Sequence, residues 1–577
     1  MWFRDYGNRG ITLLLLVTIW IIPHFTSATS KPAGKSTPQQ RETIFQHRSP
    51  TRMTIEEAMQ YERRLEDRAD FSSTAEADRS FVSPSAKAVP GEIKNYPIPP
   101  GAIYCGETTW DLQYAGSPQR SIEHCLGYNA LDGVRRYVHV TWTVLKTYDV
   151  GDSDRSVHQD WYDWTIAEWG ERLNGYRDLW GGLPIIEVGE RGGFAHVAIN
   201  SEGNAINIHH SATEGGPNYS RVVRYSIPGY GIYTADRLTN LPGQENIWLR
   251  GAIGHDELTR ATQEVYDIYH IGAHDSNPGS SDPADQCYWR YIALPSPGYW
   301  EGPVPMGQTM TVPSHVLAAD GERVVFMWSQ SRNYGEDRDN YDNDLGYWES
   351  TNAGADWIAN GGFTQTDWDA GEGYNVTDYA DADPHRVYND ISVMFDFDGR
   401  LHAIFTTPGY DDATGEVSVG PTVMYHWDEE TPGSNENAVI SGGTPGGFVG
   451  GQDIYHHIAA AALWGADDPD EANDGSSGAW NRYIAKMTLG IGDGSTACFD
   501  PDNNNSNYGY LYAFYTLFGG QAVEDKEDAS ASGYQNGNIY ISMSQDNGFS
   551  WDAGRCYTTD DGTFGGTPTR SPNCDCP

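Results

Sequence analysis

The sequence predicts an all-β fold, and two features of the chain support this. From about residue 96 onward Trp, Tyr and Gly become dense, Lys becomes rare, and short alternating strands are separated by turns rich in Gly, Asp, Asn and Pro. A strand–turn–strand unit then recurs along this region. Both features are typical of a fold made of repeated antiparallel sheets.

The recurring unit is a β-hairpin. The segments 196–209, 315–328 and 391–405 each consist of a strand, a turn that ends in Gly, and a second strand. Weaker copies surround Gly133 and Gly509. The turn glycines 203 and 321, and 399 and 509, are widely spaced, so each of these intervals has room for a further four-stranded unit or a long insertion.

An eight-residue turn motif closes the last repeat. Residues 544–551 follow the pattern Ser-x-Asp-x-Gly-x-Ser-Trp, directly after the alternating strand 539–544. Asp546 is expected to cap backbone N–H groups, Gly548 to supply a positive φ, and Trp551 to bury the turn. A degenerate copy at 350–357 keeps Ser, Gly and Trp but has Asn352 in place of Asp.

On Ser544, Asp546, Gly548 and Trp551, the region 130–577 resembles the Asp-box (BNR-repeat), sialidase-like β-propellers. The resemblance implies four-stranded blades, six of them, with seven as the alternative. Sialidases of this fold use an arginine triad, a Tyr–Glu nucleophile pair and an Asp acid/base. Their Phe/Tyr-Arg-Ile-Pro tetrapeptide is absent here, and the superfamily also resembles glycan lyases and non-catalytic binding modules.

The N-terminal segment has the layout of a signal peptide. Arg4 and Arg9 precede the apolar run 11–22, and small residues follow, with cleavage expected after Ala28. We therefore expect a signal peptide over 1–28, a flexible leader or propeptide over 29–95 with one helix near 54–68, and the propeller over 96–577. The mature protein is expected to be secreted or extracytoplasmic, in the periplasm or at the cell surface, without a membrane span.

The composition narrows the classes of partner. With 80 acidic and 37 basic residues, the net charge of −43 excludes nucleic acid, which needs a basic surface. An extracellular glycan or glycoconjugate is the expected partner, and an anionic one would need a local arginine cluster. The seven cysteines have no zinc spacing, and export favours disulfides, with Cys105–Cys125 the most local pair.

Ligands of a propeller bind over its axis, so candidate site residues are sought just before each first strand. The segment 383–390 is the richest such stretch, with a guanidinium, a phenol, an imidazole and carboxylates in eight residues. The expected catalytic residues are Asp390, Tyr388, His315 and His457. The expected substrate-binding residues are Arg386, Arg191, Arg332, His385, Asn389 and His196.

Two mechanisms can be built from these residue types. A glycosidase needs two carboxyl groups or a Tyr nucleophile supported by a carboxylate, which Asp390 with Tyr388, or Glu264 with Tyr266, could supply. A polysaccharide lyase needs a base such as His315 and a cation such as Arg386. We expect a secreted, exo-sialidase-like glycoside hydrolase acting on an anionic glycan. The alternatives are a lyase on the same scaffold and a non-catalytic propeller that binds glycan or protein.

No cofactor is expected, and a structural calcium ion is the one metal that the sequence suggests. Asp500, Asp502 and Asn504 place oxygen ligands at alternate positions, as at the start of a calcium loop. Asn505 replaces the Gly at the sixth position and Leu511 the Glu at the twelfth, so a plain Asn-rich turn is the competing interpretation.

Overall fold

The computed structural model divides the chain into two units, 1–52 and 53–577, and all the described residues belong to the second. The described residues are 122–129, 133–144, 155–163, 168–169, 182–185, 190–200, 203–213, 216–225, 233–255, 267–275, 284–292, 298–309, 315–332, 342–379, 385–388, 390–411, 416–430, 456–460, 484–492, 509–518, 537–548, 550–552 and 554–556.

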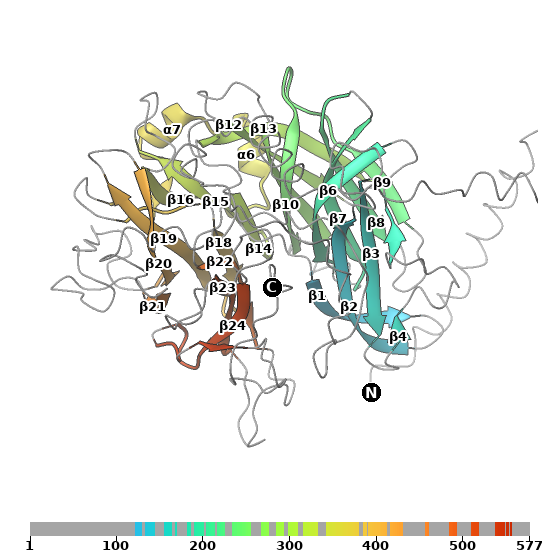
Figure 1. Cartoon of the computed structure of the whole chain (residues 1–577). Helices are drawn as coiled ribbons and strands as arrows, with labels where there is room; N and C mark the ends of the chain where they lie inside the picture. Colours follow the sequence, from blue (N-terminus) through green and yellow to red (C-terminus); the bar gives the residue numbers. More distant parts are fainter. Residues whose placement is uncertain are drawn as a thin grey trace, which may run out of the picture. The chain divides into compact units, whose positions relative to one another are not determined.

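Within these ranges the chain forms six antiparallel sheets, numbered 1 to 6 in chain order (Figure 1). Sheet 1 contains β1 (Ile122–Asn129), β2 (Gly133–Val144), β3 (Ser156–Asp163), β4 (Glu168–Trp169) and β5 (Leu183–Pro184). Sheet 2 contains β6 (Glu190–Ile199), β7 (Ala205–Thr213), β8 (Tyr219–Tyr225) and β9 (Tyr233–Arg237). Sheet 3 contains β10 (Asn246–His255), β11 (Asp267–Asp275), β12 (Ala284–Ile292) and β13 (Tyr299–Thr309).

Sheet 4 contains β14 (His315–Asp320), β15 (Arg323–Ser331), β16 (Asn343–Ser350) and β17 (Tyr374–Asn375). Sheet 5 contains β18 (Ile391–Phe395), β19 (Leu401–Asp411), β20 (Glu416–Asp428) and β21 (His456–Ala460). Sheet 6 contains β22 (Ile484–Ile491), β23 (Leu511–Phe518), β24 (Gly537–Ser544) and β25 (Arg555–Cys556). Two short helices, α6 (Ala355–Asn360) and α7 (Gln365–Asp369), lie between β16 and β17 and were not predicted.

The predicted hairpins are the first two strands of their sheets. The segments 196–209, 315–328 and 391–405 fall in β6–β7, β14–β15 and β18–β19. The turn glycines at 203, 321, 399 and 509 all have positive φ, between 58° and 81°. The interval 203–321 contains the whole of sheet 3, as its length allowed, whereas 399–509 adds no further sheet among the described residues.

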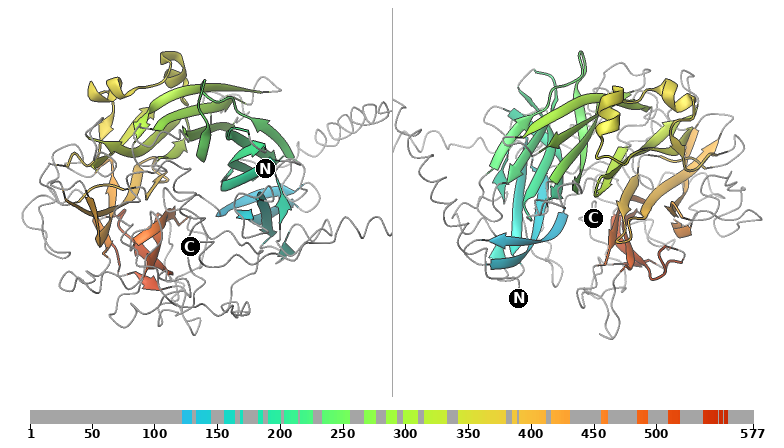
Figure 2. Two further views of the ribbon diagram at one scale, coloured as in Figure 1. Left: turned by 45° about the horizontal axis from the view of Figure 1, so that its top comes forward. Right: turned by 180° about the vertical axis from the view of Figure 1, so that it is seen from behind.

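Consecutive sheets pack face to face through apolar side chains. Val157 of sheet 1 and Val223 of sheet 2 share one buried cluster, and Ile404 of sheet 5 and Leu511 of sheet 6 share another. Similar clusters join sheets 2 and 3, 3 and 4, and 4 and 5. Each sheet between the first and the last therefore buries both faces, and Figure 2 shows the sheets from two further sides.

The first strands of sheets 2 to 6 converge on one small cavity, as expected for the axis of a propeller. Its lining comes from β6, β10, β14, β18 and β22: His196, Arg250, Val316, Leu317, Ser392, Val393 and Thr488. The cavity is large enough for a water molecule and far too small for a sugar ring.

The predicted roles in the turn motif are confirmed. The Asp546 carboxylate accepts hydrogen bonds from the Ser550 N–H (2.8 Å) and hydroxyl (2.6 Å). The Ser544 hydroxyl accepts from the N–H of Gly548 (2.8 Å), whose φ is 91°. The Trp551 ring packs on the cluster between sheets 5 and 6 and donates through Nε1 to the Gly548 carbonyl.

The degenerate copy reproduces this network. The Ser350 hydroxyl accepts from the Gly354 N–H (2.9 Å), and the Asn352 side-chain oxygen accepts from the Asp356 N–H (3.1 Å). Gly354 has φ of 77°, and Trp357 is fully buried. Both motifs come at the end of the third strand of a sheet. Because the side-chain oxygens of Asn352 and Asp546 accept the equivalent backbone hydrogen bond, Asn can take the place of Asp in this turn.

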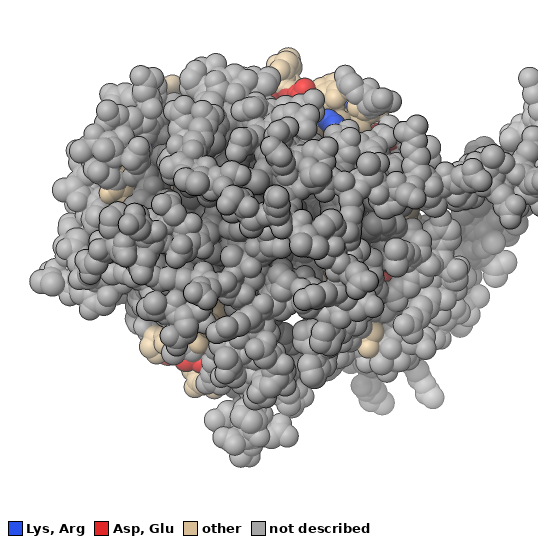
Figure 3. Space-filling view, in the orientation of Figure 1, with Lys and Arg blue, Asp and Glu red and all other residues tan. Residues whose placement is uncertain are grey.

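Several predictions lie outside the described residues. These are the signal peptide, the leader with its helix near 54–68, and Asp500, Asp502 and Asn504. Among the cysteines only the side chain of Cys287 is described, and it is a buried free thiol. No helix in the described ranges is long and apolar enough to span a membrane. Among the described side chains that reach the face drawn in Figure 3, acidic groups lie near the top and the bottom.

Candidate functional site

The two residues expected to lead catalysis, Asp390 and Tyr388, are buried parts of the scaffold. The Asp390 side chain is fully buried, and its Oδ1 accepts a hydrogen bond from the Lys486 backbone N–H (3.2 Å) at the start of sheet 6. Tyr388 is 1% exposed, and its carbonyl accepts from the Ser329 hydroxyl. Asp390 therefore links sheet 5 to sheet 6, and Tyr388 links the start of sheet 5 to sheet 4.

The predicted substrate-binding arginines of sheets 4 and 5 are engaged in an ion-pair network. Arg386 is fully buried and donates through Nε to Asp342 at 2.5 Å. Arg332 lies 3.3 Å from the same carboxylate and 3.5 Å from Asp344. His385 forms a bridge with Gly409, and its carbonyl accepts from Arg386. Among the described residues, two guanidinium groups are thus matched by two carboxylates.

The predicted histidines at the strand starts also lie in the core. His315 packs edge-on against His274, with ring centroids 4.3 Å apart, and stacks on Phe326. Burial, and then the charge of Arg250, lowers the pKa of His315 to about 3. His196 lines the axial cavity and donates through Nε2 to the Gly251 carbonyl (2.9 Å), which ties sheet 2 to sheet 3.

The remaining candidates are placed as follows. His457 lies in β21, the last strand of sheet 5, and not at the start of a first strand as predicted. Asn389, Glu264 and Tyr266 lie outside the described residues. Arg191 lies in β6 opposite Ala212 and is half-buried. Of the predicted set, Arg191 alone belongs to the group of side chains described next.

At one end of sheets 1 and 2, the start of β3, the start of β6, the end of β7 and the start of β8 carry five basic side chains, with His209 and His210 on opposite faces of sheet 2. We call Arg155, Arg191, His209, His210 and Arg221 the arginine–histidine cluster. Arg155 donates through Nε to the Gly192 carbonyl (2.9 Å), and its Nη2 lies 3.3 Å from His210 Nε2. His209 pairs with Arg221 across β7 and β8.

The contact with Arg155 fixes the tautomer of His210. A guanidinium can only donate, so His210 Nε2 must accept and the ring proton of the neutral imidazole lies on Nδ1. Burial lowers the pKa of His210 well below its usual value, and Arg155, His209 and Arg191 add to this. His210 is therefore a neutral hydrogen-bond donor, held in place by Arg155.

His209 differs from His210 because neither ring nitrogen has a hydrogen-bond partner among the described residues. Its side chain is fully buried, and burial together with Arg221 lowers its pKa to about 3. At neutral pH it is an uncharged imidazole with a free lone pair. A negative charge that entered the cluster would raise this pKa and make the ring a stronger base.

A tyrosine and a glutamate complete the cluster. The Tyr219 hydroxyl donates to Glu190, whose other oxygen lies 3.3 Å from Arg221. Burial, and then Glu190, raises the pKa of Tyr219 to about 12, so the phenol keeps its proton at neutral pH. Tyr219 pairs with Ser211 two residues from the His209–Arg221 pair, so the phenol and the His209 imidazole are diagonal neighbours on one face of sheet 2.

The backbone beside the cluster is strained. Phe194 has φ of 57°, in the left-handed region that bulky residues rarely adopt, and its ring stacks on His210 at 5.2 Å. The N–H of Phe194 donates to the hydroxyl of Thr143 (2.9 Å). A Cβ on Gly193 would lie 3.3 Å from Arg155 Nε. The Arg155 guanidinium therefore reaches His210 by passing Gly193, where any larger side chain would crowd the guanidinium.

Sequence reasoning missed most of this cluster because it considered only residues before first strands. In an antiparallel sheet the second strand ends, and the third begins, at the same edge where the first begins. The adjacent pair His209-His210 at the end of a predicted hairpin was the available signal. Arg155 gave no such signal, because it precedes a third strand that the hairpin repeat did not include.

Comparisons with known proteins give distant structural likenesses only. No family model and no curated protein matches the chain. It is similar to a PL25 ulvan lyase, with 11% identity over 77% of this chain and 84% of that one, at a TM-score of 0.38. It is similar to polysaccharide lyase Uly1, with 12% identity over 78% of this chain and 94% of that one, at a TM-score of 0.33. It is also similar to Trypanosoma rangeli sialidase, with 8% identity over 69% of this chain and 56% of that one, at a TM-score of 0.30. These TM-scores are too low to carry an argument about function.

Proposed function

We propose that this chain is a carbohydrate-active enzyme that cleaves an anionic, uronate-containing glycan by β-elimination, with its site at the arginine–histidine cluster. One observation supports this most strongly. In a chain with a net charge of −43, Arg221 lies beside the neutral imidazole of His209, Arg155 and Arg191 lie beside that of His210, and Glu190 pairs with Arg221. Guanidinium groups beside neutral imidazoles suit a ligand that brings its own negative charge.

The chemistry assigns roles to the guanidinium groups, His209 and Tyr219. The guanidinium groups hold the uronate carboxylate and stabilise the charge that develops on it. His209 takes the proton from the carbon next to that carboxylate, and its pKa rises as the anion binds. Tyr219, protonated because its pKa is about 12, turns its hydroxyl from Glu190 to the departing glycosidic oxygen and gives it the proton.

The step balances without a further reactant. The electrons of the broken C–H bond form a carbon–carbon double bond as the C–O bond at the neighbouring carbon breaks. His209 gains one proton and Tyr219 loses one. Glu190 links the phenol to Arg221 while the charge of the phenol changes. The products are an unsaturated uronate and a new sugar end.

This proposal replaces the glycoside hydrolase as the leading function. Hydrolysis needs a pair of carboxyl groups across the glycosidic bond, or a Tyr nucleophile supported by a carboxylate together with a separate acid. The described residues of the cluster include Glu190 as a carboxylate, and it is bonded to Tyr219 and Arg221. The imidazole–phenol pair suits proton abstraction better than nucleophilic displacement.

The proposal has one structural requirement. His209 is fully buried, His210 is 4% exposed and Arg155 is 6% exposed. A glycan must therefore displace part of the chain that covers them before it reaches the cluster. We also propose that the six sheets are the blades of a six-bladed propeller. The signal-peptide layout supports secretion as the route by which the enzyme meets extracellular glycan.

The test is a product screen of the purified protein on sialosides and on uronate polysaccharides with and without sulfate, ulvan among them. We expect ultraviolet absorbance of an unsaturated uronate to rise together with reducing ends. Reducing ends without that absorbance would make the protein a hydrolase. Binding without any product would leave the non-catalytic propeller.

Variants connect the activity to the cluster. His209→Gln should lower the rate by about 10²- to 10⁴-fold, the usual contribution of a general base. The matched control is His139→Gln, because His139 is also a buried, neutral histidine, bonded to the Gly203 carbonyl at the other end of the hairpin. Equal loss in both variants would mean that His209 only packs the core.

A further inference from the structure

A second group of histidines lies at the opposite ends of the strands, in sheet 5. His402 of β19 pairs directly with Asp428 of β20, and His426 lies two residues before Asp428 on the same strand. Because side chains alternate along a strand, all three point to the face that carries Ile404. Ile404 belongs to the apolar cluster between sheets 5 and 6, so the three side chains lie between these two sheets.

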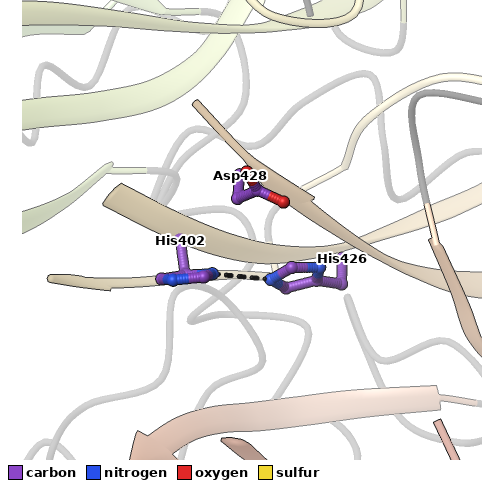
Figure 4. A group of neighbouring side chains, drawn as sticks. All are labelled: His402, His426 and Asp428. Atoms are coloured by element: carbon purple, nitrogen blue, oxygen red, sulfur yellow. Dashed lines mark hydrogen bonds between the residues drawn. The ribbon is translucent and has the colours of Figure 1, made fainter. Parts of the chain in front are cut away.

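Their ligand atoms converge, as Figure 4 shows. His402 Nδ1 lies 2.9 Å from His426 Nε2. One ring nitrogen of each histidine and a carboxylate oxygen of Asp428 all lie within 4.8 Å of one another. Two nitrogens bound to one tetrahedral zinc ion, each about 2.0–2.1 Å from it, are about 3.3 Å apart. An opening of a few tenths of an ångström therefore converts the imidazole pair into a chelating pair.

The second nitrogen of His402 already makes the contact that metal-binding histidines usually make. His402 Nε2 lies 3.2 Å from Asp396 Oδ2. A carboxylate can only accept, so Nε2 carries the ring proton and the Nδ1 lone pair points at His426. A histidine oriented through its far nitrogen by a carboxylate is the usual arrangement around protein-bound zinc.

The surroundings fit a divalent ion in charge and in access. Asp428 and Asp396 together supply two negative charges, which balance one divalent cation. Asp428 is 1% exposed, and both histidines are fully buried. The turn motif of sheet 6 lies against His426. A Cβ on Gly548 would lie 2.0 Å from His426 Cε1, and the ring centroids of Trp551 and His426 are 5.5 Å apart.

We propose that His402, His426 and Asp428 bind a divalent transition-metal ion, with zinc as the expected metal, that fastens sheet 5 beneath the turn motif of sheet 6. Two imidazole nitrogens and a carboxylate suit zinc, and they do not suit calcium, which prefers oxygen ligands. The three ligands leave a fourth position for water. The site lies beside the turns between strands, at the other strand ends from the arginine–histidine cluster, so its role is structural and does not depend on the proposed reaction.

The experiment is zinc binding by the whole chain, stripped with chelator, dialysed against zinc chloride and analysed for metal per chain. We expect one tightly bound zinc ion, a melting temperature that rises with zinc concentration, and reversal by chelator. Cobalt in place of zinc should give the intense visible spectrum of a tetrahedral site. None of these readouts depends on enzymatic activity.

Variants distinguish this site from adventitious binding. His402→Gln and Asp428→Asn should each abolish the tight site, and Asp396→Asn should weaken it by about 10- to 100-fold, the usual effect of losing an orienting carboxylate. His270→Gln is the control, because His270 is equally buried and its Nδ1 lies 2.5 Å from the Tyr288 hydroxyl in sheet 3. The proposal would be overturned if the wild-type protein retained no zinc. It would also be overturned if the His402→Gln variant still bound zinc and its cobalt form had the same visible spectrum as the wild-type protein.

Discussion

At the scale of single residues, Gly548 shows why the turn motif needs glycine for two separate reasons. Its φ of 91° is one that other residues avoid, and a Cβ would meet the His426 ring. Gly371 has a similar φ of 79° but open space around it. A comparison of substitutions at Gly548 and Gly371 therefore separates the cost of backbone strain from the cost of steric overlap.

We expect Gly371→Ala to lower the free energy of unfolding by about 1–2 kcal/mol through strain alone. Gly548→Ala should lose about 1–3 kcal/mol more, because the His426 ring has to move. Urea denaturation of both variants measures the difference, with Gly490→Ala, which has neither a positive φ nor a neighbour within 4 Å, as the control. Equal losses at Gly548 and Gly371 would show that the contact with His426 is not formed.

Single residues are also where the sequence alone says least about the surroundings of a side chain. Arg386 and Arg332 were expected to bind substrate because a guanidinium can hold an anionic sugar, and in the structure Asp342 and Asp344 pair with them. Those two carboxylates lie more than 40 positions before Arg386 in the chain, on the neighbouring sheet. A sequence shows that an arginine is present, whereas the packing of two sheets decides whether its charge is already matched.

At the scale of elements, the first strands of sheets 2, 3 and 6 each contain a bulge at an equivalent place. Phe194, Trp248 and Lys486 occupy these bulges, and all three have positive φ. In two of them a side chain of the preceding sheet accepts the bulged N–H: Thr143 for Phe194 and Asp390 for Lys486. The bulge and its acceptor therefore act together to link adjacent sheets.

This gives Asp390 a structural role that can be tested. Asp390→Leu leaves the Lys486 N–H buried and unbonded, and should lower the free energy of unfolding by about 1–3 kcal/mol. Asp390→Asn keeps an acceptor oxygen and should restore most of that loss, with activity retained. If Asp390→Asn folds with wild-type stability and is inactive, the original assignment of Asp390 as a catalytic residue is correct.

Elements were also the level at which the sequence was most informative. The hairpin repeat and the turn motif predicted the first two strands of five sheets, because alternation and an obligatory glycine are local signals. Sheet 3 was only allowed for by a long interval: the turn between β10 and β11 lacks the acidic-Gly signature of the others. Helices α6 and α7 follow the degenerate motif, and no apolar period announced them.

At the scale of the whole molecule, the sheets bury several neutral histidines. The pKa values of His209, His270 and His315 fall to about 3 and that of His139 to about 4, in each case chiefly through burial. The unfolded chain protonates these groups below about pH 6.5. The folded chain therefore binds fewer protons between about pH 6.5 and 3, and stability falls as the pH falls through that window.

We expect His315→Gln to reduce this sensitivity to acid. Each buried histidine contributes about 1.4 kcal/mol per pH unit in the window, so removal of one should make the loss of stability between about pH 7 and 5 smaller by about 2 kcal/mol. Carboxylates contribute equally to both proteins and cancel in the comparison. Denaturation curves at the two pH values measure it, and the same loss in wild type and variant would show that His315 is not buried in its neutral form.

The most direct test of the central claim is the rate of glycan cleavage by Arg155→Met against that by Arg224→Met. Arg155 contacts His210, whereas Arg224 pairs with Asp236 and lies over the Tyr291 ring, outside the cluster. We expect Arg155→Met to lose about 10²- to 10³-fold in kcat, Arg155→Lys to recover part of this, and Arg224→Met to stay near the wild-type rate at equal folded fraction. Equal rates for Arg155→Met and Arg224→Met would contradict the placement of the site at the arginine–histidine cluster.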